Sequence, residues 1–183
     1  MMKKSKVIRN LTDCMVPHRM CRVVTKDDSN YYVNYFPLKV NEEFFLGAKE
    51  DDFQLNGFKI CPVERVKKAD VRDDKCLDIN ICEGVVDALH IPKVNISGWK
   101  QIFRSIKDMN KYVMIIVDDE KCYAERLYIG SIVRIKKHSI LLRHFDADGI
   151  WQDEPVKIRI KDIQSVEFGS RYVDVFSKYI PKL

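Results

Sequence analysis

The feature that most constrains this chain is an apolar pattern that recurs after 97 residues. Residues 63–71 (VERVKKADV) lie over residues 160–168 (IKDIQSVEF), and apolar positions coincide at 63/160, 66/163, 69/166 and 71/168. The same shift places Phe45 on Leu142. A period of this length predicts one small unit built twice, because each copy must bury an apolar face of its own.

The segment between the two copies is rich in residues that interrupt regular structure. Residues 90–98 read HIPKVNISG, and Pro, Asn, Ser and Gly favour turns and linkers. We therefore expect two domains, residues 1–92 and residues 98–183, each with its own core.

Each copy is predicted to begin with an amphipathic helix. In the second copy, apolar residues recur at helical spacing with Lys and Arg between them: Trp99, Ile102, Phe103 and Ile106. In the first copy, the same spacing is found in Val7, Ile8, Leu11 and Met15. One apolar stripe on each helix is expected to face a sheet.

After its helix, the second copy predicts five short strands and a closing helix. The strand segments are rich in β-branched and aromatic residues or alternate apolar with charged ones: 112–117, 123–135, 139–145, 156–160 and 164–168. Turns are expected at residues 118–121 (DDEK) and 146–149 (DADG), and a closing helix over residues 172–179. We expect a mainly β fold with short helices: two tandem five-stranded barrels of SH3-like type, each preceded by a helix.

The second copy resembles the Sm-like branch of the small SH3-like barrels. Residues 130–142 (GSIVRIKKHSILL) are similar to the first Sm motif, a Gly and alternating apolar residues running through a hairpin. Residues 158–166 (IRIKDIQSV) are similar to the second motif, in which the family has Ile-Arg-Gly. The resemblance covers about residues 99–170 and implies the barrel. The chain also looks generally similar to uncharacterised bacterial proteins of this barrel type.

The chain departs from the family at the residues that matter for RNA. Family members that bind RNA hold a base with the Arg-Gly turn and with an Asn in the first hairpin. Here Ile160 replaces the Gly, and the hairpin of the second copy has no Asn. The first copy departs further, with Cys61-Pro62-Val63 at the turn. The resemblance therefore implies the barrel directly. RNA binding follows from it only by extension from the family members that bind RNA.

The six cysteines form no Cys-x-x-Cys pair, and buried free thiols are the simplest expectation. Cys14, His18 and Cys21 form the one cluster with ligand-like spacing. A structural zinc site needs four ligands, and no second half is visible. We expect two core thiols beside an exposed His and no metal, with a metal at this cluster as the alternative.

Catalysis, cofactors and membranes are not indicated by the sequence. No Gly-rich segment precedes a predicted helix, and the four histidines are well separated. We expect no enzyme activity and no cofactor. No stretch approaches the roughly 20 apolar residues that cross a bilayer, so we expect a cytoplasmic protein that does not contact membranes.

Basic residues gather on one predicted hairpin, within a net charge of +5. The candidate nucleic-acid-binding residues are Arg134, Lys136, Lys137, His138, Arg143 and Lys161. Lys157 and Arg159 on the neighbouring strand are expected to extend this surface, and Tyr123, Tyr128 or Trp151 to stack on bases. The alternative is that these cations only solvate the outer faces of strands.

Two functions remain open from the sequence. The first is a binding or scaffold protein that acts on protein partners, or on copies of itself, through strand edges. The alternative is RNA or single-stranded nucleic-acid binding through the basic hairpin of the second copy.

Overall fold

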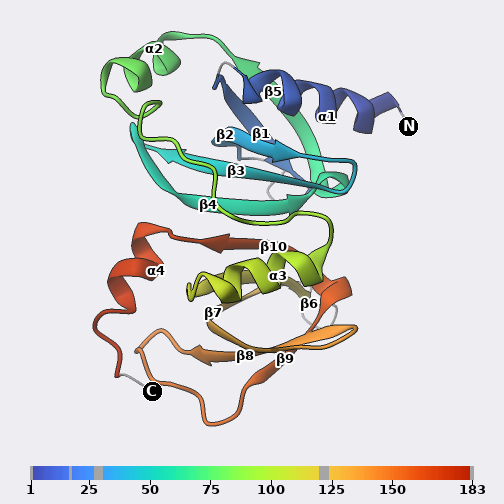
Figure 1. The fold of residues 1–183 in the computed structure, drawn as a ribbon, viewed down its shortest axis with the longest axis vertical. Coiled ribbons are helices and arrows are strands. Elements are labelled where there is room, and N and C mark those ends of the chain that lie inside the picture. The colour runs from blue at the N-terminus through green and yellow to red at the C-terminus, as the bar shows by residue number, and fades with distance from the viewer. Residues whose placement is uncertain (1, 17, 27–30, 120–123, 182–183) are drawn as a thin grey trace. The chain divides into compact units, whose positions relative to one another are not determined.

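A computed structural model describes all of the chain except residues 1, 17, 27–30, 120–123 and 182–183 (Figure 1). The chain divides into two compact units, Met1–Ser97 and Gly98–Leu183. The described residues are mainly β, with 43% in strands and 25% helical. The predicted class, mainly β with short helices, is confirmed.

Unit 1 contains a helix, five antiparallel strands and a second helix. The elements are α1 (Met2–Met15), β1 (Met20–Thr25), β2 (Val33–Val40), β3 (Phe44–Asp51), β4 (Gln54–Pro62), the 3-10 helix η1 (Val63–Arg65), β5 (Val66–Arg72) and α2 (Lys75–Cys82). The strand order is β5-β1-β2-β3-β4.

The core of unit 1 lies between α1 and this sheet. Leu11 of α1 and Phe45 of β3 are fully buried, and the Phe45 ring meets Tyr35 edge to face at 5.8 Å. Asn10 donates from Nδ2 to the Ala69 carbonyl at 2.7 Å, which ties α1 to β5. The segment at the start of the chain whose apolar residues have helical spacing therefore forms the predicted helix.

Helix α2 and the segment that follows it were not predicted. Asp74 caps α2 by accepting a hydrogen bond from the Cys76 amide. Further along, Lys39 donates from Nζ to the Val94 carbonyl at 2.7 Å, and Asn41 donates from Nδ2 to the Ile96 carbonyl at 2.9 Å. These bonds hold residues 92–96 on unit 1, so this unit continues to Ser97 instead of ending at 92.

Unit 2 repeats the order of helix, four strands, 3-10 helix and fifth strand. Its elements are α3 (Trp99–Asp108), β6 (Val113–Asp119), β7 (Ala124–Ile135), β8 (Ser139–Phe145), β9 (Val156–Arg159), η2 (Ile160–Asp162), β10 (Ile163–Phe168) and α4 (Arg171–Phe176). The strand order is β10-β6-β7-β8-β9. All five predicted strands are present. The predicted turn over 118–121 falls partly on residues 120 and 121, which lie outside the described residues.

Strand β7 belongs to two ladders, which overlap at Ile129 and Gly130. Residues 124–130 pair with β6, and residues 129–135 pair with β8. A Cβ atom at Gly130 would stand 1.9 Å from the Arg143 carbonyl oxygen. Only glycine allows the backbone of β8 to approach β7 this closely.

The prediction of closed barrels is wrong. A closed barrel needs the two end strands of its sheet to pair. Within each unit the end strands, β4 and β5 in unit 1 and β9 and β10 in unit 2, share no ladder among the described residues. The 3-10 helices η1 and η2 join these strands, and each turns the chain with a hydrogen bond of its own, as from the Val66 amide to the Val63 carbonyl. The backbone groups at the junction are thus used locally, and each five-stranded sheet stays open.

The pairing of strands also corrects the alignment of the two copies. Phe45 pairs with Cys61 in unit 1, and Ile140 pairs with Ile158 in unit 2. Phe45 therefore corresponds to Ile140 and not to Leu142. The alignment changes here because the connection between the paired strands differs in length between the units. It is a two-residue turn at 52–53 in unit 1, but it runs over residues 146–155 in unit 2.

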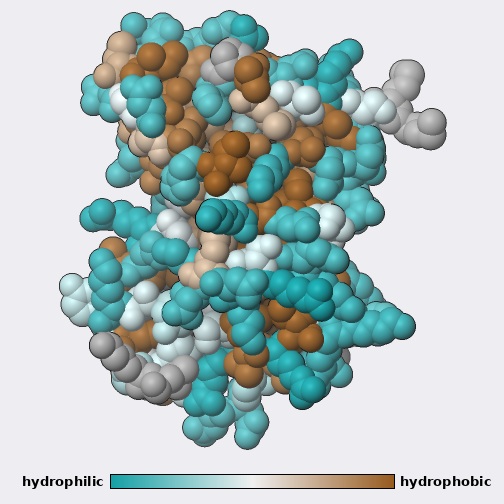
Figure 2. Space-filling view, in the orientation of Figure 1, coloured by the Kyte–Doolittle hydropathy of each residue, from teal (hydrophilic) through white to brown (hydrophobic). Residues whose placement is uncertain are grey.

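Two further observations concern the distribution of apolar residues. On the face drawn in Figure 2, hydrophilic side chains separate apolar patches over both units. Among the residues described, no helix has the length and apolar character needed to span a bilayer.

Candidate polyanion-binding site

The first half of the site is the tight turn between β7 and β8. The Lys136 amide donates to the Ser139 carbonyl at 2.8 Å and closes this turn. Lys136, Lys137 and His138 all lie at its tip and are exposed. The turn therefore presents three basic side chains in succession on a fixed backbone.

The second half is the junction of β9 with η2. Ser139 and Arg159 are partners in the β8–β9 ladder, and the Ile160 amide donates to the His138 carbonyl at 3.0 Å. The backbone thus holds the start of η2 against the hairpin tip. Residues about 20 positions apart in the sequence become neighbours.

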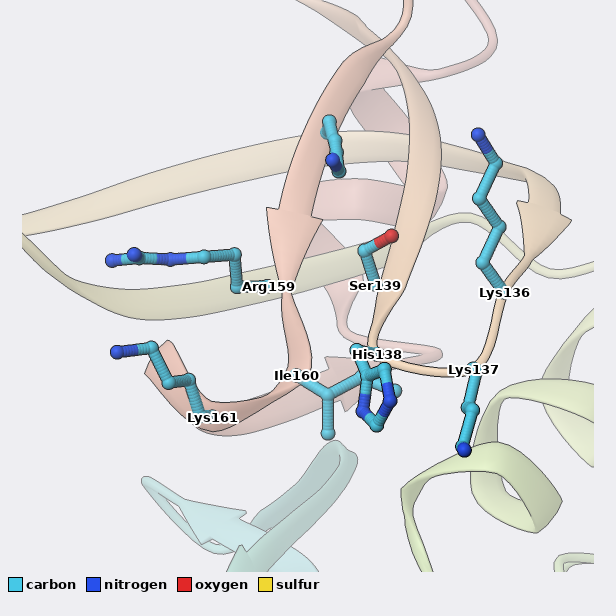
Figure 3. A pocket seen from close by; sticks show the side chains of 8 residues that line it. Lys136, Lys137, His138, Ser139, Arg159, Ile160 and Lys161 are labelled. Atoms are coloured by element: carbon cyan, nitrogen blue, oxygen red, sulfur yellow. The ribbon is translucent and has the colours of Figure 1, made fainter.

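These two segments line a cavity of about 660 Å³. Its walls are formed by Lys136, Lys137, His138, Ser139, Lys157, Arg159, Ile160 and Lys161. Figure 3 shows that Arg159 and Lys161 extend side by side on one side of His138, while Lys136 and Lys137 stand on the other side. The cations therefore flank the cavity in two groups and do not converge on one point.

The cavity carries a positive charge that is only partly neutralised. Arg159 donates from Nε to Asp162 Oδ2 at 2.5 Å, so this guanidinium is held by a carboxylate. Within the described residues, the four lysines of the cavity have no carboxylate within 4.0 Å. Uncompensated ammonium groups around a concave surface attract phosphates and other anions.

The structure brings together four of the six candidate residues from the sequence: Lys136, Lys137, His138 and Lys161. Lys157 and Arg159, expected as an extension, line the same cavity. Arg143 does not, because it lies four residues along β8 from Ser139, and a strand advances about 3.4 Å per residue. Arg134, exposed on β7 opposite Leu141, also lies outside the cavity.

The aromatic residues expected to stack on bases are elsewhere. Tyr128 meets the His144 ring at 5.4 Å. Trp151 packs on Phe145 at 5.3 Å and donates from Nε1 to the Pro181 carbonyl. Tyr123 lies outside the described residues. Among the described lining residues, His138 supplies the only ring, so the cavity offers charge and little stacking surface.

The metal-like cluster of the sequence is part of the core of unit 1. Cys14 and Cys21 are buried, and His18 is exposed. The hydrogen bond with Cys14, together with burial, raises the pKa of the Cys21 thiol, which therefore stays protonated. No group of three metal-ligating side chains is found in the described part of the chain.

The expectation of buried thiols is wrong for two cysteines. Cys61 is buried, whereas Cys76 and Cys82 on α2 are exposed. Helix α2 was not predicted, and its buried face holds Leu77 and Asn80 instead of the two cysteines. Cys122 lies outside the described residues.

Comparison of the chain with protein-family models, curated proteins and solved structures gives no match.

Proposed function

We propose that this chain is a non-enzymatic binding protein whose second unit binds a single-stranded polyanion, RNA in the first place, in the basic cavity. The observation that carries the proposal is that five cationic side chains, from the β7–β8 turn and from the β9–η2 segment, line one concave surface. Four of them are lysines without a carboxylate partner among the described residues. Counterion release from a polyanion is the natural source of affinity for such a surface.

The arrangement of the cations favours a chain of phosphates over a single one. Lys136 and Lys137 stand on the opposite side of His138 from Arg159 and Lys161 (Figure 3). The two groups offer separate contacts to more than one phosphate. A strand that crosses the hairpin tip places successive phosphates against each group in turn.

The ligand is single-stranded and is bound with little sequence preference. Reading a duplex in its major groove requires a helix or β-ribbon that enters the groove, and the cavity is instead a hollow between two loop tips. With no Trp, Tyr or Phe in its lining, base stacking contributes little. The resemblance of 130–142 and 158–166 to the Sm motifs supports RNA over DNA, because RNA-binding members of that family use the same two loops.

The element order that the two units share supports a relationship of unit 1, as well as unit 2, to the Sm-like barrels, in an open form. Each unit has a helix, four strands, a 3-10 helix and a fifth strand in the same order. A cytoplasmic location is part of this proposal, because single-stranded RNA is abundant there.

The proposal is tested by titrating a fluorescent ten-nucleotide oligouridylate and following anisotropy at several salt concentrations. About four phosphate contacts predict a roughly 50-fold loss of affinity between 50 and 200 mM salt. Lys136→Glu with Lys137→Glu should weaken binding at least tenfold. The matched control is Lys67→Glu with Lys75→Glu, which makes the same charge change at exposed positions of unit 1 and should change affinity less than threefold.

Two results would reject the proposal. One is binding that does not depend on salt. The other is an equal loss in the cavity variant and in its control, because that result would assign binding to net charge alone.

A second candidate function, binding to protein partners, is favoured by the open sheets. Among the described residues of each unit, β5 pairs only with β1, and β9 pairs only with β8. An extended peptide can add to such an edge through main-chain hydrogen bonds. A pull-down that survives the glutamates at 136 and 137 but is lost with Lys157→Pro, in protein with unchanged circular dichroism, would favour this function over RNA binding.

A further inference from the structure

The two loops that form the basic cavity have counterparts in unit 1 with the same backbone hydrogen bonds. In unit 1 the Asn41 amide donates to the Phe44 carbonyl at 2.9 Å, as Lys136 does to Ser139 at 2.8 Å. The Val63 amide donates to the Glu43 carbonyl at 2.8 Å, as Ile160 does to His138 at 3.0 Å. The two frameworks therefore place their side chains in corresponding positions.

The strand registers fix this correspondence residue by residue. Phe44 pairs with Pro62 in unit 1, and Ser139 pairs with Arg159 in unit 2. The corresponding pairs, with unit 2 first, are Lys136 and Asn41, Lys137 and Glu42, His138 and Glu43, Lys157 and Ile60, Arg159 and Pro62, and Lys161 and Glu64. The backbone is shared, but the charge is not.

The charge at these positions changes sign between the units. Glu42, Glu43 and Glu64 are all exposed, so they present carboxylates where unit 2 presents Lys137, His138 and Lys161. One neighbouring position changes in the opposite sense, since Arg65 corresponds to Asp162. In unit 2 that Asp162 is hydrogen-bonded to Arg159, so it does not remove the lysine charge.

The side chain of Asn41, which takes the place of Lys136 in the unit 1 loop, already makes hydrogen bonds within unit 1. Asn41 accepts hydrogen bonds at Oδ1 from the amides of Glu43 and Phe44, at 2.8 and 2.7 Å. Its Nδ2 donates to the Ile96 carbonyl. Asn41 therefore fixes the shape of its own turn, and its amide is not available to a ligand.

We infer that the chain holds one polyanion site and not two, and that Glu42, Glu43 and Glu64 are the residues that exclude phosphate from unit 1. This inference rests on the proposed function of unit 2. Carboxylates at the positions of Lys137, His138 and Lys161 repel the phosphates of a strand, whereas the lysines of unit 2 attract them. A bound strand thus contacts unit 2 alone.

The test is a count of bound strands by native mass spectrometry, with a six-nucleotide oligouridylate and low-salt buffer. Wild-type protein is expected to bind one strand per chain. Glu42→Lys with Glu43→Lys and Glu64→Lys is expected to bind two. The matched control is Asp13→Lys with Glu83→Lys and Asp87→Lys, which adds the same charge at exposed positions of unit 1 and is expected to bind one.

The outcomes separate this inference from the proposed function. Two strands on the wild-type protein, or one strand on both the wild-type protein and the loop variant, would overturn the inference and leave the unit 2 site in place. A loop variant that binds one strand while the wild-type protein binds none would refute the unit 2 site. It would still support the inference that the carboxylates of unit 1 exclude phosphate from its loops. No binding by either protein would refute both.

Discussion

Replacing Gly130 with alanine should reduce the stability of unit 2 more than the addition of one methyl group usually does. The added Cβ would lie 1.9 Å from the Arg143 carbonyl oxygen and 2.8 Å from both the Arg143 carbonyl carbon and His144 Cα. All three neighbours are backbone, so the contact cannot be relieved by rotating a side chain. The strands β7 and β8 must separate by about 1.5 Å to reach an ordinary contact of about 3.5 Å.

The cost of this separation can be estimated from two contributions. Overpacking costs about 1–3 kcal/mol. Loosening the ladder around the Gly130–His144 pair weakens two or so hydrogen bonds at about 1 kcal/mol each. The expected loss is about 3–5 kcal/mol, which for a unit of this size lowers the melting temperature by roughly 15 °C or more.

Differential scanning calorimetry of the full chain measures this loss as a downward shift of the unit 2 transition. Gly47→Ala is the control, because its nearest neighbours are Tyr35 side-chain atoms at 3.1 Å and beyond. That change should cost about 1 kcal/mol, since a side chain can give way more easily than backbone. A Gly130→Ala protein that melts within 3 °C of wild type would refute the reasoning about β7.

Two further perturbations test the packing of each unit. Leu11→Ala removes a fully buried side chain between α1 and the sheet, so it should reduce the free energy of unfolding by about 2–5 kcal/mol in urea titrations; a loss below 1 kcal/mol would contradict the core described for unit 1. In unit 2, burial lowers the pKa of His144. The unfolded chain therefore takes up a proton near pH 6.5 more readily than the folded chain, and this contribution to stability is lost as the pH falls through that value. Wild-type protein should lose more stability than His144→Gln between pH 7.5 and 5.5, and parallel losses in the two proteins would contradict the assignment.

The strands and the helices α1 and α3 could be predicted because their side chains alternate or repeat with the right period. Ser139–Phe145 is a strand with the predicted bounds. The buried residues Ile102, Phe103 and Ile106 form one face of α3. Such patterns depend only on which side of an element faces the core, and this information is local in the sequence.

Helix α2 could not be predicted in the same way. It is only eight residues long, and of its apolar residues Leu77 is buried while Ile81 is exposed. Its start depends on the Asp74 cap, a signal that many turns also carry. Closure of the sheets was likewise beyond the sequence, because strand patterns do not tell whether the last two strands pair.

The candidate site was predicted in part for a related reason. Lys136, Lys137 and His138 are consecutive, so any tight turn presents them together. Lys161 joins them through the bond between the Ile160 amide and the His138 carbonyl and through the pairing of β9 with β8, and a strand neighbouring the hairpin was expected to extend the surface. Arg143 was included because of its charge, and its distance along β8 excludes it.

Binding of a polyanion between the β7–β8 turn and η2 can be observed residue by residue in an amide NMR titration of the full chain with oligouridylate. We expect the shifts that change with added RNA to gather at residues 136–139 and 157–161, while those of residues 41–43 and 64 stay unchanged. Changes spread over both units, or confined to unit 1, would contradict the assignment of the site.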